Sequence, residues 1–220
     1  MNCQKVILPV CLSVVGLLAV AGSLAAGDPT KDIKPAGQPA GEMQLPPGWT
    51  PQDMQACMAA ATPGAQHQML AAGAGNWSGK SQMWMAPGTP AIDTANTCTV
   101  TPIMDGRYVK TEFTGDMPGM GPFTGFGING FDNVSKKFVA TWIDNMGTGI
   151  MNGTGEVSSD GKVITWTFSV NCPITGKPTT LREIETITGP NTKTLEMWGI
   201  DPKSGKEFKS MFIELTRQPA

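Results

Sequence analysis

Residues 160–171 read Asp-Gly-Lys-Val-Ile-Thr-Trp-Thr-Phe-Ser-Val-Asn. From Ile164 to Val170, four apolar residues occupy every second position, and three hydroxyl-bearing residues stand between them. A period of two is typical of a β-strand with one buried face. The Asp160-Gly161 pair in front of this run predicts a tight hairpin turn, because such turns need residues that accept a positive φ.

Similar β-rich runs follow one another from Gly75 to the C-terminal region, separated by turn residues at intervals of about 8–12 residues. No helical crossover interrupts them, which indicates an antiparallel sheet. A long meander loses its exposed edges when it closes on itself, so we expect an all-β, up-and-down antiparallel β-barrel over residues 75–217. About ten strands are expected, at residues 76–85, 92–102, 107–115, 122–131, 137–144, 149–157, 162–170, 179–188, 193–200 and 206–217.

Two further segments precede the expected barrel. Residues 27–49 are rich in Pro, Gly and Ala without a hydrophobic period, which predicts a disordered linker. Thr50-Pro51 supplies a capping residue and a proline at the first helical position, and Thr62-Pro63 repeats this pattern. We therefore expect a short N-terminal helical plug over residues 50–74, with helices near 51–61 and 63–72.

Residues 1–26 combine a short polar start, an apolar run and a small-residue exit, which is the layout of a secretory signal peptide. Ser23 and Ala25 fit the small-residue requirement of the cleavage site. An uncleaved membrane anchor is the alternative, because the apolar run is nearly long enough to span a bilayer. Pro9 and the small exit residues favour cleavage, so we expect a periplasmic or secreted protein with no membrane segment after cleavage.

The composition of the remaining chain bears on its partners. Removal of Lys5 with the signal leaves 15 basic and 18 acidic residues without a basic stripe, so nucleic acid is not an expected partner. The sequence leaves the oligomeric state open. Of the three remaining cysteines, Cys98 and Cys172 fall in or beside strand-like segments and are the expected disulfide, with Cys57 left over. The chain has one histidine, His67, and no C-x-x-C motif, so no metal site is predicted.

Three patterns suggest chemistry but have simpler explanations. Residues 125–130 match G-x-G-x-x-G, yet they lead into a hairpin rather than a helix, so glycines that allow close strand approach are favoured over a nucleotide site. The chain contains 14 methionines, which could bind Cu(I) through their thioether sulfurs. We favour a packing role instead, in which they fill gaps in the core or form a pliable barrel mouth. His67 stands beside Met69 and Leu70, which favours a structural role.

Several motifs carry a family resemblance. Gly75-Asn76-Trp77, directly after a predicted helix, looks like the G-x-W entrance of the lipocalin superfamily, whose tryptophan closes one end of the barrel; this implies that Trp77 does so here. Over residues 62–217 the chain resembles the bacterial domain-of-unknown-function family 1579, most clearly in Thr141-Trp142-Ile143-Asp144-Asn145-Met146-Gly147. The resemblance implies a calycin-type, lipocalin-like barrel, distantly similar to nitrobindin. A nitrobindin-like haem needs a histidine on a late strand, which this chain lacks, so no cofactor is expected.

Charged and aromatic residues share strand faces at several positions. Trp142 shares a face with Asp144, Tyr108 with Glu112, and Trp198 with Glu196. Inside a barrel, such residues would hold a ligand with a polar head and an apolar body. The equal alternative is a solvated outer face, or buried ion pairs that fix the register. The candidate ligand-binding residues are Trp142, Asp144, Arg182, Glu185, Trp198, Tyr108 and Glu112.

Three classes of function remain open at this stage. The favoured one is a non-catalytic binding module that encloses a small, partly apolar ligand. The second is an isomerase- or cyclase-like enzyme that uses an interior carboxylate, such as Asp144 or Glu185, with an arginine to hold an oxyanion. The third is a structural envelope interaction protein, which needs a large exposed apolar patch. The sequence assigns no catalytic residue.

Overall fold

A computed structural model describes residues 45–219 of the chain. The expected signal peptide and nearly all of the expected linker lie outside these residues. No helix in the described part of the chain is long and apolar enough to cross a membrane.

Two short helices precede the barrel, α1 (Pro51–Ala61) and α2 (Ala65–Ala71). Thr50 and Asp53 form a reciprocal capping box at the start of α1. α2 begins two residues later than predicted because Gly64 is extended and caps the helix, and its N–H donates to Nδ1 of His67. His67 is buried edge-on against Phe131, as expected of a structural histidine.

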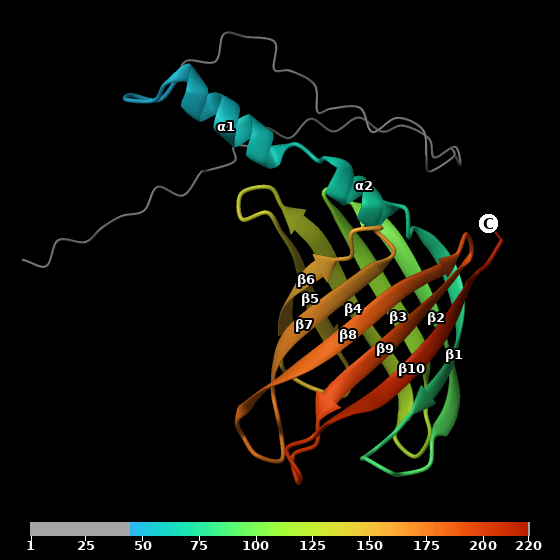
Figure 1. Ribbon diagram of the computed structural model, residues 1–220. Coiled ribbons are helices and arrows are strands. Elements are labelled where there is room, and N and C mark those ends of the chain that lie inside the picture. The colour runs from blue at the N-terminus through green and yellow to red at the C-terminus, as the bar shows by residue number, and fades with distance from the viewer. Residues whose placement is uncertain (1–44, 220) are drawn as a thin grey trace, which may run out of the picture. The chain divides into compact units, whose positions relative to one another are not determined.

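Ten antiparallel strands form a closed barrel in which β1 pairs with both β2 and β10, and the other strands pair in chain order. The predicted fold class is thereby confirmed, and the strand bounds differ from the prediction by at most two residues (Figure 1). The strands are β1 (Gly75–Met83), β2 (Ile92–Ile103), β3 (Tyr108–Met117), β4 (Gly121–Asp132), β5 (Lys137–Asp144), β6 (Met151–Val157), β7 (Val163–Asn171), β8 (Pro178–Gly189), β9 (Thr192–Ile200) and β10 (Glu207–Arg217).

The hairpin turns form where the sequence predicts them. Gly106, Gly161 and Gly205 have φ values of 77°, 71° and 71°. Residues with a side chain rarely adopt this conformation, so these positions favour glycine. On β7, the apolar alternation places Trp166 and Phe168 in the buried core.

β1 begins at one end of the barrel, which we call the plugged end because α2 lies there and contacts β3 and β4 (Figure 1). Trp77 is the third residue of β1. The indole N–H of Trp77 donates to the carbonyl of Gly73 at 3.1 Å, and Leu70 of α2 belongs to the same buried core. The Arg217 guanidinium stacks on the Trp77 ring and donates to carbonyls that follow α2. A side chain at Gly75 would meet this guanidinium, and φ at Gly75 is 128°, so glycine is needed in the G-x-W motif.

The opposite end, which we call the mouth, carries the loops 84–91, 118–120, 145–150, 172–177 and 201–206. The first three of these loops contain no charged residue. Exposed apolar side chains occur in these three loops and in loop 172–177, namely Met85, Met120, Met146, Ile150 and Ile174. The mouth therefore has an apolar side, formed by loops 84–91, 118–120 and 145–150, while loops 172–177 and 201–206 also carry charged residues.

Candidate functional site

The barrel encloses a cavity of about 320 Å³. Its walls are mostly apolar, with a small number of polar groups among them. Met146 lines the cavity and is also 42% exposed in the β5–β6 loop, so the cavity reaches the mouth. Small-molecule sites in proteins usually have this size range and this composition. The aromatic and thioether walls include Phe113, Phe123, Trp142, Trp166, Phe168, Met83, Met151, Met197 and Met211.

Glycines on β4 make room for one of these walls. A Cβ at Gly125 would lie 2.5 Å from the Trp142 ring, and one at Gly127 would lie 3.1 Å from it. The indole of Trp142 therefore packs against β4 at two glycines, which have no side chain to obstruct it. The G-x-G-x-x-G stretch is thus explained by close packing inside an antiparallel sheet, and residues 125–130 lie within a strand rather than at a helix start.

An ion pair lies on the wall towards the plugged end. The ammonium of Lys193 is 2.8 Å from the carboxylate of Glu185 and 4.8 Å above the ring of Trp77. Burial opposes the charge of Lys193, but the attraction and hydrogen bond of Glu185 outweigh it and raise the Lys193 pKa. Lys193 is therefore held charged by its partner.

Glu183 lies one pleat from Glu185 and also faces the cavity. Among the described residues, no side chain donates a hydrogen bond to it or forms an ion pair with it within 4.0 Å. Burial and the nearby charge of Glu185 raise its pKa to about 8, while Lys193 opposes the rise. Of the described acids that line the cavity, Glu183 is thus the one that is neither paired nor exposed, and it changes its charge about one pH unit above neutrality.

A second polar group lies towards the mouth. The Trp142 indole N–H donates to one oxygen of Asp144 at 2.8 Å, and the other oxygen accepts from the Met146 backbone at 2.9 Å. Both carboxylate oxygens are therefore occupied. Asp144 orients the Trp142 ring and anchors the β5–β6 loop, which borders the mouth.

Three of the seven candidate ligand-binding residues line the cavity, namely Trp142, Asp144 and Glu185. Arg182 and Trp198 do not, because their strand neighbours Leu181, Glu183 and Met197 take the inward positions. Of the two placements that the sequence left open for Arg182 and Trp198, the structure has the outer one.

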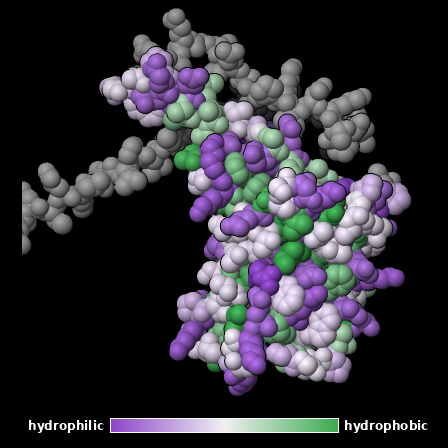
Figure 2. Space-filling view, viewed as in Figure 1, coloured by the Kyte–Doolittle hydropathy of each residue, from purple (hydrophilic) through white to green (hydrophobic). Residues whose placement is uncertain are grey.

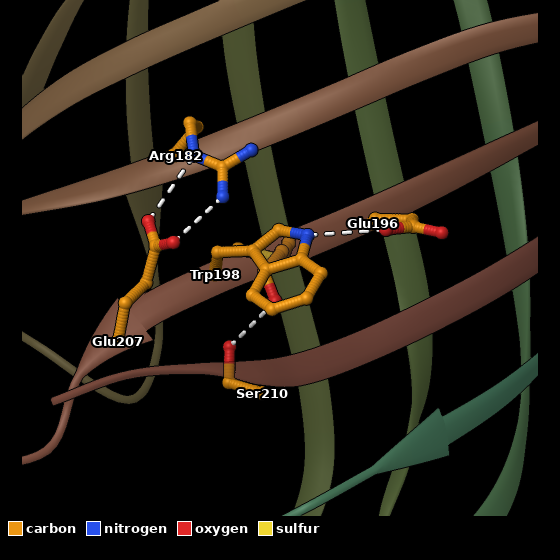
Figure 3. A network of polar contacts seen from close by, with 6 residues as sticks. Arg182, Glu196, Trp198, Glu207 and Ser210 are labelled. Carbon is orange, nitrogen blue, oxygen red and sulfur yellow. Dashed lines mark hydrogen bonds and ion pairs between the residues drawn. The ribbon is translucent and has the colours of Figure 1, made fainter.

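Arg182 and Trp198 instead belong to a polar network on the outer wall (Figure 3). Arg182 donates twice to Glu207, at 3.1 and 2.8 Å, and its guanidinium lies 5.2 Å from the Trp198 ring centre. The Trp198 indole donates to Glu196. The alternative explanation of these residues, ion pairs that join neighbouring strands, fits this network.

Tyr108 and Glu112 also face outwards on β3, where the interior positions belong to Val109, Thr111 and Phe113. Tyr108 is 42% exposed, and Glu112 pairs with Lys110 at 2.7 Å on the surface. For Tyr108 and Glu112 too, the structure has the outer of the two placements that the sequence left open.

Most of the chain matches a known family profile. The profile described as "Protein of unknown function (DUF1579)" matches residues 62–217. The chain belongs to the DUF1579 family. Comparison of this DUF1579 chain with curated proteins gave no match.

Two solved structures are similar to this DUF1579 protein. Rv2717c from M. tuberculosis is 16% identical, with a TM-score of 0.52, over 72% of this chain and 100% of that one. The S-type phycobiliprotein lyase CpeS from Guillardia theta is 8% identical, with a TM-score of 0.49, over 72% of this chain and 99% of that one. At 16% identity, the likeness to Rv2717c shows the fold alone.

The cysteines of this DUF1579 protein do not pair as expected. Cys57, Cys98 and Cys172 are all free thiols in the structure. Cys98 is buried opposite Trp77 in the β1–β2 register, whereas Cys172 lies in the β7–β8 loop at the mouth. The predicted Cys98–Cys172 disulfide is therefore not formed, because its two members lie towards opposite ends of the barrel.

Sequence reasoning missed two polar groups of the site, Glu183 and Lys193. A signal for Glu183 was present, because it stands two residues from Glu185 and so shares its face of β8. Lys193 has no such signal: it is the second residue of β9, and lysine usually lies on the surface at a strand end.

Proposed function

We propose that this protein is an exported, non-catalytic binding module that holds a small, partly apolar ligand inside its barrel. The cavity, lined by aromatic and thioether side chains and reaching an apolar mouth, carries this proposal. A ligand would enter past Met146 and Met151 and lie against Trp142 and Trp166. The proposed export rests on the signal-peptide pattern of residues 1–26.

The arrangement expected for an isomerase-like enzyme has less support. That hypothesis requires an interior carboxylate beside an arginine, and the described cavity lining contains Lys193 but no arginine. Lys193 is already engaged by Glu185. A structural role through the face shown in Figure 2 also has less support, because the hydrophobic groups on that face are interrupted by hydrophilic side chains.

The experiment is native mass spectrometry of the protein purified from its own host, compared with two variants. Thr111→Trp places a large ring into the cavity, and Thr114→Trp places the same ring on the outer face of the same strand. We expect a small-molecule adduct on the wild type and on Thr114→Trp, and none on Thr111→Trp. A folded wild type that carries no adduct and takes up no apolar probe contradicts the proposal.

A further inference from the structure

The charges that face the cavity are unbalanced. Asp116, Asp144, Glu183 and Glu185 supply four carboxyl groups, and Lys193 is the one cationic side chain in the described lining. Glu185 holds Lys193 at 2.8 Å, and Trp77 covers it. The interior therefore offers no free positive charge to an anionic ligand among the described residues, and it retains surplus negative charge.

Glu183 is where that surplus is available. Asp116 is exposed near the mouth end of β3. Asp144 has both oxygens occupied by the Trp142 indole and the Met146 backbone, and Glu185 is occupied by Lys193. Glu183 lines the cavity with neither a hydrogen-bond donor nor an ion-pair partner among the described side chains. An unpaired polar group away from bulk water is costly, so a ligand that donates to Glu183 would recover that cost.

The walls around Glu183 suit an organic cation. In the sheet register its neighbours are Trp166 on β7 and Met197 on β9. Aromatic faces attract cations, and the attraction grows when water is excluded. The apolar lining beyond these neighbours, towards the mouth, suits a hydrocarbon body.

Resting on the proposed function, we infer that the ligand is an amphiphilic amine, whose cationic nitrogen is bound by Glu183 and whose apolar body extends towards the mouth. Glu183 provides the counter-charge, and the aromatic walls provide the contact area. A fatty acid of the same shape would face the unpaired carboxyl instead, with Lys193 already neutralised.

The test compares three probes with the same hydrocarbon chain, namely decylamine, decanol and decanoate, below their micelle-forming concentrations. Binding is measured by titration of tryptophan fluorescence, since Trp142 and Trp166 line the cavity. Above pH 8, where the Glu183 carboxyl is ionised, we expect decylamine to bind at least about tenfold more tightly than the other two probes. A tenfold difference corresponds to about one charge-assisted hydrogen bond. Glu183→Gln should remove this preference, and Glu156→Gln, an exposed position on β6, should keep it.

The pH profile of the wild type gives a second readout that needs no variant. The groups that face Glu183 are Glu185 on its own strand, Lys193 on β9 and Cys98 on β2. Because the Glu183 pKa is raised to about 8, decylamine affinity should increase up to that pH and then level off. Decanoate affinity should fall over the same range, and decanol affinity should stay constant.

The outcomes separate the two proposals. Equal binding of all three probes, or decanoate as the tightest, overturns the amine inference and leaves the binding function intact. Unchanged decylamine preference in a folded Glu183→Gln protein overturns it as well. Failure of every probe to bind the folded wild type overturns the binding function, and the inference with it.

Discussion

The ammonium of Lys193 meets the carboxylate of Glu185 at 2.8 Å inside the barrel, with the ring of Trp77 on its other side. Lys193 on β9 thus contacts both Trp77, near the plugged end, and Glu185, which lines the cavity. A buried ion pair contributes little relative to an apolar replacement, but a single buried charge left behind is costly.

Lys193→Met should lower the free energy of unfolding by about 3 kcal/mol, because it leaves Glu185 without its partner. The double variant Lys193→Met/Glu185→Leu should recover most of this loss. Urea unfolding measures both. Lys110→Met is the control, since its pair with Glu112 is on the surface and should contribute less than about 1 kcal/mol. A double variant no more stable than the single one would contradict the explanation.

Glu183 should make the protein less stable as the pH rises. Its pKa is about 8 in the folded protein and near its ordinary value of 4.5 in the unfolded chain. Between these values the native state holds a proton that the unfolded chain has released, so the free energy of unfolding falls by about 1.4 kcal/mol per pH unit from this group. Below pH 4.5 both states are protonated, so the free energy of unfolding no longer depends on pH through Glu183.

Urea unfolding of wild type and Glu183→Gln at several pH values measures this slope. The variant should lose the Glu183 part of the slope and become more stable than the wild type at the alkaline end. Glu156→Gln should retain the wild-type slope, because Glu156 is exposed. Parallel curves for wild type and Glu183→Gln would show that Glu183 titrates normally.

Gly125→Ala should destabilise the barrel by about 1–3 kcal/mol through overpacking. Its Cβ would lie 2.5 Å from the Trp142 ring and 2.9 Å from Cβ of Asp144, so the ring must shift. Thermal unfolding gives the stability, and the tryptophan emission spectrum reports the shifted ring. Gly147→Ala is the control, because a Cβ there meets nothing within 4 Å. Equal stability of the two variants would show that the Trp142 ring can shift without a loss of stability.

Cys172 and Cys98 should differ in their reactivity. The Thr175 hydroxyl and backbone lower the pKa of the Cys172 thiol, and burial raises that of Cys98 to about 12. The thiolate is the reactive form, so iodoacetamide at neutral pH should modify Cys172 in the native protein and Cys98 only after unfolding. Peptide mass spectrometry locates the label. A Cys98–Cys172 disulfide-linked peptide from the native protein would contradict the free thiols.

The strands could be predicted because local chemistry sets them. The apolar period of β7 and the turn glycines Gly106, Gly161 and Gly205 act within a few residues, and the barrel follows from the number and order of such units. The helix α2 was misplaced by two residues because Thr62, the expected cap, donates instead to the carbonyl of Met58 at the end of α1.

The face of each strand was harder to predict than the strand itself. A tryptophan two residues from a carboxylate occurs both inside, as Trp142 with Asp144, and outside, as Trp198 with Glu196, and the same hydrogen bond forms in both. On β8 charged residues occupy both faces, so alternation alone does not orient the strand. Only the register with neighbouring strands separates Glu183 from Arg182.

The pairing of β1 with β10 has a consequence for how the chain folds. It joins Trp77 to Arg217, so the ring closes between the first strand and the last. A chain that stops before β10 leaves the backbone of β1 without its second partner, and Trp77 without the guanidinium that stacks on it. The barrel therefore cannot close until the final strand has been made. Pairing between strands so far apart in the sequence also slows folding.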